Sequence, residues 1–120
     1  MAVALLSCGG GGDMLINPVA RSGSIVIEIS RSTPPEFNWR DGLPVQAISV
    51  YNFTPAGEVD QVLWGYANIS IRPPITYGAR LSGGIDLTGG RPAPPLQPGL
   101  RYRVEVVRGN ESSYADWIVP

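Results

Sequence analysis

The sequence contains no histidine and no lysine, and it has a single cysteine. The missing histidine removes the commonest general base and the usual zinc ligand. The missing lysine removes Schiff-base chemistry and the lysine of a phosphate-binding loop. One cysteine cannot form a disulfide within the chain. Acid–base chemistry would depend on the ten carboxylates or the tyrosines, so we expect neither an enzyme nor a bound metal or other cofactor.

The charge of the chain is nearly balanced, with nine arginines, ten carboxylates and a net charge of −1. The arginines are scattered, which provides no basic patch for nucleic acid or for anionic lipid. No internal apolar run reaches the roughly 18 residues needed to cross a bilayer. We therefore expect no nucleic-acid partner and no membrane-spanning segment.

Turn-forming residues interrupt the chain throughout, because 15 glycines and 12 prolines occur among 120 residues. That density excludes long helices, whereas the 43% hydrophobic content is enough for one packed core. Apolar residues alternate with polar ones in several short runs, most clearly at 24–30, 61–71, 100–108 and 114–119. The pattern predicts an all-β domain over residues 21–120, a single immunoglobulin-like β-sandwich of seven or eight strands.

Two segments resemble fibronectin type III domains. Residues 96–106 read Leu-Gln-Pro-Gly-Leu-Arg-Tyr-Arg-Val-Glu-Val, similar to the corner before the sixth strand of that family. There a tyrosine starts the strand and its hydroxyl bonds to backbone upstream, a role that the resemblance gives to Tyr102. Residues 35–39, Pro-Glu-Phe-Asn-Trp, resemble an early strand of bacterial members, which implies that Trp39 packs in the core. Between residues 57 and 90 the chain departs from the family pattern, so no strand order is predicted there.

The remaining tryptophans lie on predicted strands. Trp117 shares one face of the last strand with apolar neighbours and is expected in the core. Trp64 and Tyr66 lie one strand period apart. Such pairs either fill a sandwich core or stand exposed, where they stack on sugars or bind a protein. Both alternatives stay open for Trp64 and Tyr66.

Three carboxylates lie in turn regions, where such side chains could bind calcium. Glu58 and Asp60 follow a Pro-Ala-Gly turn, and Asp86 lies between two glycine pairs. Their spacing is neither that of an EF-hand nor that of a calcium-binding repeat. We expect them to be solvated turn residues without a metal.

The N-terminal segment carries the only indication of location. Residues 5–8, Leu-Leu-Ser-Cys, precede four glycines and resemble the lipobox of bacterial lipoproteins, in which the cysteine carries the lipid. A secretory signal runs about 15–30 residues with a basic start, whereas only seven residues, none of them basic, precede Cys8. We therefore expect the signal to begin upstream of Met1. Residues 1–20 are interpreted as a partial signal peptide and a flexible glycine-rich tether; the alternative is a disordered N-terminus with an unused thiol.

The resemblance implies a bacterial envelope protein held to the membrane by a lipid on Cys8, and Gly9 after the cysteine favours the outer membrane. The domain offers scaffold residues without a catalytic set, so we expect a monomeric, non-catalytic binding or structural module. Two alternatives remain. One is an envelope inhibitor or accessory subunit that docks a protein partner through a loop or an edge strand. The other is a carbohydrate-binding module that uses Trp64 and Tyr66.

Overall fold

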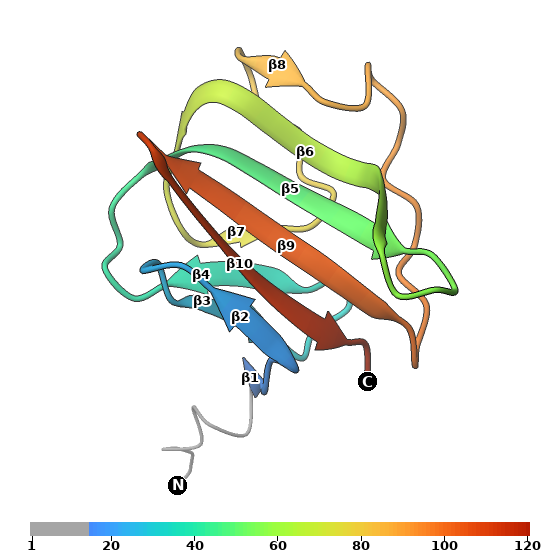
Figure 1. Cartoon of the computed structure of the whole chain (residues 1–120). Coiled ribbons are helices and arrows are strands. Elements are labelled where there is room, and N and C mark those ends of the chain that lie inside the picture. The colour runs from blue at the N-terminus through green and yellow to red at the C-terminus, as the bar shows by residue number, and fades with distance from the viewer. Residues whose placement is uncertain (1–14) are drawn as a thin grey trace, which may run out of the picture.

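A computed structural model describes residues 15–120, which form an all-β, immunoglobulin-like sandwich of two antiparallel sheets (Figure 1). The strand order is β1-β3-β4-β7 in one sheet and β2-β10-β9-β5-β6-β8 in the other. Within these residues no helix has the length and apolar character needed to span a membrane. Cys8 and the predicted lipobox lie outside the described part of the chain.

The two sheets differ in the length of their strands. The four-stranded sheet consists of β1 (Leu15–Ile16), β3 (Ile27–Ser30), β4 (Glu36–Trp39) and β7 (Ile75–Thr76). The six-stranded sheet consists of β2 (Ala20–Ser22), β5 (Val45–Phe53), β6 (Val59–Ile71), β8 (Ile85–Asp86), β9 (Arg101–Arg108) and β10 (Glu111–Ile118).

The described residues thus contain ten strands, more than the seven or eight predicted from the sequence. The excess comes from β1 and β2, which have two and three residues, lie at sheet edges and fall where the sequence predicts no strand. Two residues are too few to show an alternation in sequence. Short edge strands also leave little unpaired backbone for unwanted association.

The strand order that the sequence left open between residues 57 and 90 is now defined. β6 pairs with β5 along nearly its whole length, from Val45 opposite Ile71 to Phe53 opposite Val59. The chain then crosses to the other sheet, where β7 pairs with β4, and returns as β8 to the outer edge of β6. This path places residues 91–98 along the open end of the sandwich, ahead of β9 (Figure 1).

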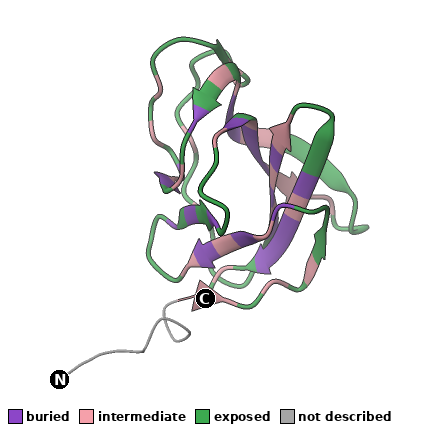
Figure 2. Cartoon of the chain, turned by 90° about the vertical axis from the view of Figure 1, so that its left-hand side faces the viewer, coloured by how far each residue is buried: buried purple, intermediate pink, exposed green. Residues whose placement is uncertain are grey.

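The core lies between the inward faces of the two sheets, shown as purple segments in Figure 2. Trp39 and Trp117 are 1% and 0% exposed. Phe37 meets Trp117 edge to face at 5.6 Å between ring centroids, and Tyr102 lies 5.9 Å from the same ring. Such aromatic pairs contribute about 0.5–1.5 kcal/mol beyond the burial of their area.

The boundary of the sandwich lies further toward the N-terminus than the sequence predicted. Leu15 and Ile16 in β1 pair with Ser30 and Ile29, and β2 pairs with β10. Residues 15–20, which the sequence predicts to belong to the tether, are therefore part of the folded domain. Asn17 and Pro18 separate β1 from β2 where the chain passes from one sheet to the other.

Candidate functional site

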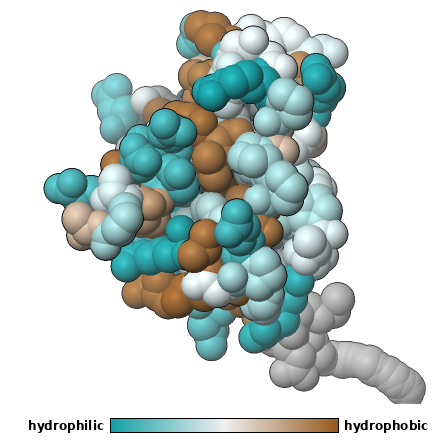
Figure 3. Space-filling model, turned by 90° about the vertical axis from the view of Figure 1, so that its right-hand side faces the viewer, coloured by the Kyte–Doolittle hydropathy of each residue, from teal (hydrophilic) through white to brown (hydrophobic). Residues whose placement is uncertain are grey.

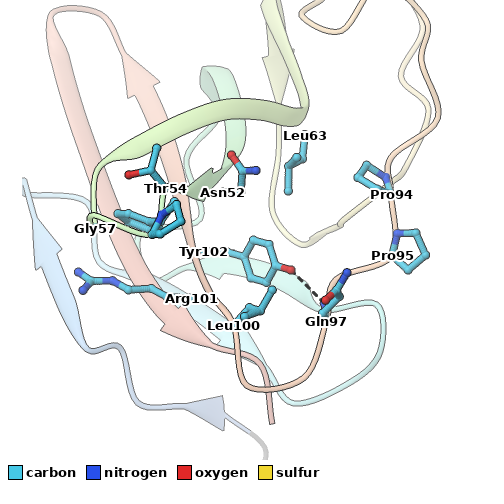
Figure 4. A pocket seen from close by; sticks show the side chains of 12 residues that line it. Asn52, Thr54, Gly57, Leu63, Pro94, Pro95, Gln97, Leu100, Arg101 and Tyr102 are labelled. Atoms are coloured by element: carbon cyan, nitrogen blue, oxygen red, sulfur yellow. Dashed lines mark hydrogen bonds between the residues drawn. The ribbon is translucent and has the colours of Figure 1, made fainter.

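An open groove of about 540 Å³ lies at the end of the sandwich where β5 ends and β9 begins (Figure 4). We call it the corner groove. Three parts of the chain bound it: the β5–β6 turn, the proline segment (residues 91–98) and the first residues of β9. Apolar and aromatic side chains make up much of its lining, including Phe53, Leu63, Pro94, Pro95, Leu100 and Tyr102.

Tyr102 fixes one end of the proline segment. It is 4% exposed, and its hydroxyl accepts a hydrogen bond of 3.0 Å from the backbone N–H of Gln97 (Figure 4). Between them Gly99 has φ +83°, a conformation that glycine adopts without the steric penalty of a side chain. The contact has the geometry of a tyrosine corner and sets where the segment meets β9.

Tyr77 holds the same segment from the other side. It is 5% exposed, and its hydroxyl donates a hydrogen bond of 2.7 Å to the carbonyl of Pro94. Burial raises the pKa of Tyr77, so the phenol keeps its proton and remains a donor. A second hollow of about 240 Å³ lies beside this contact, lined in part by Pro34 and Pro35. The proline segment is therefore anchored at two points by tyrosine hydroxyls.

A buried carboxylate lies close to the groove on the outer face of the six-stranded sheet. Asp116 is 0% exposed, and it accepts bonds of 2.7 Å from Arg101 Nη2 and 2.7 Å from Arg103 Nε. A further bond of 3.2 Å joins Arg103 Nη2 to the same carboxylate. We call these three residues the Asp116 cluster. Hydrogen bonding to Asp116 raises the pKa of Arg103, which keeps that guanidinium charged.

Aromatic rings cover the arginines of the Asp116 cluster. The guanidinium of Arg101 lies 4.8 Å from the centroid of the Phe53 ring, and that of Arg103 lies 3.6 Å from the Tyr114 ring. These distances allow cation–π attraction. Phe53 and Arg101 also line the corner groove, so the cluster forms one wall of it.

The polar groups of the described region are mostly engaged with one another. Asp41 pairs with Arg108 and Glu28 with Arg40, while the carboxylate of Glu105 accepts bonds from two hydroxyls. In residues 15–120 no three metal-binding side chains gather at one place. The corner groove offers proline faces, aromatic rings, amides and a hydroxyl, which are groups suited to contact with another molecule.

The structure places Trp64 and Tyr66 inside the molecule. They are 5% and 6% exposed, and their rings meet edge to face at 6.2 Å. The indole N–H of Trp64 donates to the carbonyl of Ala79 at 2.9 Å, which satisfies its one polar group. Of the two alternatives left open for Trp64 and Tyr66, the structure supports the core position, which leaves no exposed pair for stacking on sugars.

Sequence reasoning missed the Asp116 cluster and the contact of Tyr77. A signal for the first was present: the turn at residues 109–110 and the alternation of both strands set Arg103 opposite Asp116. No comparable signal marks Tyr77. Comparison of the chain with protein-family models, with curated proteins and with solved structures found no match.

Proposed function

We propose that the protein is a non-catalytic module of the bacterial cell envelope that docks a protein partner at the corner groove. A lipid on Cys8 would hold it to the outer membrane as a monomer, as the lipobox resemblance and Gly9 suggest. The observation that carries the docking role is the groove of about 540 Å³ beside a proline segment that two buried tyrosines hold in place.

The composition of the groove favours a protein partner. Leu100 lies at the edge of the groove and is 49% exposed. Ile118 is also exposed, and it lies beside Leu100 because it pairs with the next residue, Arg101, between β10 and β9. Asn52 and Gln97 supply amides around the apolar surface. An apolar centre with a polar rim is the usual build of a protein–protein interface. Figure 3 shows this side of the molecule, where hydrophobic residues form a band between hydrophilic ones.

The groove is also preorganised. The proline segment is held by its hydrogen bonds with Tyr77 and Tyr102, and the start of β9 by the ion pairs of Asp116. A surface that is already ordered loses less conformational entropy when a partner binds. This favours the accessory-subunit alternative over a passive structural module, because structural support alone does not require an ordered open groove.

The docking role is tested by photo-crosslinking in the source cells. A photoreactive phenylalanine derivative replaces Leu100 at the groove, or Asn38 on the outer face of β4 as a matched exposed control. We expect a discrete protein adduct from the Leu100 position and none from the Asn38 position. Absence of an adduct at Leu100, or the same adducts from both positions, would overturn docking at the groove.

The anchor is tested separately. In a chain expressed with its complete signal, Cys8→Ser is expected to move the protein from the membrane fraction to the soluble envelope fraction. Unchanged fractionation would contradict lipid attachment and would leave the docking role untouched, because the groove lies in the folded domain.

A further inference from the structure

The proline segment shows a repeat of three residues in its burial. Ala93 and Leu96 are half-buried against the body of the domain, whereas the other residues from 91 to 98 are exposed. The segment forms neither helix nor strand. Three residues per turn is the repeat of a polyproline II helix. In that register Pro92 and Pro95 share one exposed edge, ahead of the turn at Pro98 and Gly99.

Side chains, rather than strand pairing, hold this segment to the domain. Tyr77 donates to the carbonyl of Pro94, and Tyr102 accepts from the N–H of Gln97. At the start of the segment, Arg91 Nε donates to the carbonyl of Thr88 at 3.2 Å. These three bonds fix the segment near its start, middle and end without covering its prolines.

Hollows lie on both sides of the exposed prolines. The corner groove reaches Pro94 and Pro95 from one side, and the hollow beside Tyr77 reaches the same two residues from the other. A third hollow of about 240 Å³ adjoins Arg91 and Pro92. The proline segment is thus a raised ridge, with space along its flanks for side chains of a second molecule.

Arg91 marks the first end of the ridge with a positive charge. Its side chain is exposed, and its Nε donates to the carbonyl of Thr88 at 3.2 Å. Across residues 15–120 it takes part in none of the ion pairs, unlike Arg101 and Arg103. A partner that follows the ridge would therefore meet a guanidinium able to bind a carboxylate.

We propose that residues 91–98 are a preformed polyproline II ligand, which the partner grips in a groove lined by aromatic side chains, with an acidic residue opposite Arg91. Aromatic-lined grooves recognise proline-rich segments because such segments are already extended and have little conformational entropy left to lose. This inference rests on the proposed docking function and names the chemistry of the partner's surface.

An NMR titration of the ¹⁵N-labelled full chain tests the aromatic preference. The probes are N-acetyl-tryptophanamide and, as an apolar control without a ring, N-acetyl-leucinamide. We expect the tryptophan probe to shift the amide signals of Ala93, Leu96 and Gln97 about threefold more than the leucine probe, as aromatic stacking on proline requires. Equal shifts with both probes, or no shift at these amides, would overturn the proposal.

Variants of the ridge separate this inference from the docking function. With the photoreactive residue at position 100, Pro92→Ala/Pro95→Ala is expected to lower the adduct on the order of tenfold, because the ligand loses its preorganisation. Arg91→Gln tests the charge and should also lower the yield of the adduct. An unchanged thermal midpoint would show that both variants fold. An undiminished adduct in the proline variant overturns the ridge and leaves docking intact. If the chain without ridge substitutions gives no adduct, docking itself is overturned.

Discussion

Two regions that meet at the start of β9 are held in opposite ways. On the outer face of the six-stranded sheet, Asp116 is fully buried and both of its partners are charged. At the end of the sandwich, the neutral hydroxyls of Tyr77 and Tyr102 hold the proline segment and leave its prolines exposed. The polar groups of the Asp116 cluster bind one another, whereas the two tyrosines hold in place a surface that stays accessible to other molecules.

The two arrangements also differ in what their loss costs. A buried carboxylate is tolerated only while its charge is compensated, so removal of one partner costs more than the pair itself contributes. A neutral hydrogen bond contributes about 0.5–1.5 kcal/mol, and its loss leaves one polar group unsatisfied. We therefore expect the Asp116 cluster to be the more sensitive region for stability and the proline segment for binding.

The largest effect is expected from Arg103→Met, which removes two of the three hydrogen bonds to Asp116. Breaking a buried pair from one side costs about 3–5 kcal/mol. Because Arg103 is partly exposed and Arg101 still pairs with Asp116, the expected loss lies at the lower end, about 3 kcal/mol. Chemical denaturation measures the change. Arg40→Met is the matched control, since its pair with Glu28 is exposed and contributes about 0.5 kcal/mol. Equal losses in the two variants would contradict a special role for the Asp116 cluster.

A smaller effect is expected from Tyr102→Phe, which removes the acceptor for the N–H of Gln97. The loss should be about 1–2 kcal/mol, as for a part-buried hydrogen bond whose partner stays behind. Tyr66→Phe serves as the control, because its ring is equally buried while its hydroxyl takes part in none of the hydrogen bonds found in residues 15–120. An unchanged unfolding midpoint for Tyr102→Phe would mean that the proline segment does not depend on this corner.

The two regions also differ in how much of their structure could be predicted from the sequence. β9 and β10 are long, alternate regularly and are joined by a tight turn, so their faces and register follow from local pattern. The contact of Tyr77 with Pro94 joins the turn after the two-residue strand β7 to a segment without strand pairing, and no local pattern predicts it. Strand alternation likewise shows that Trp64 and Tyr66 share a face, but only the packing of the sheets decides that this face is inward.

The smallest effect concerns an exposed ion pair and sharpens the comparison with buried Asp116. Arg108 donates to both carboxylate oxygens of Asp41, at 2.7 and 3.0 Å, and this hydrogen bonding lowers the pKa of Asp41 below its usual value. The folded state therefore binds that proton more weakly than the unfolded state. The resulting stabilisation is present above about pH 3.9, the ordinary aspartate pKa, and is lost as the pH falls through the lower folded value.

Asp41→Asn should accordingly flatten the fall in unfolding midpoint between about pH 5 and pH 2, so that variant and parent converge at the acidic end. Some slope should persist in the variant, because bonds from Thr88 lower the pKa of Asp86 independently of Arg108. Denaturant titrations at closely spaced pH values measure both slopes. If the two proteins keep parallel curves down to the acidic limit, the exposed pair has no measurable coupling to folding. The exposed Asp41–Arg108 pair would then differ in kind from the ion pairs of buried Asp116, which would keep their effect on folding.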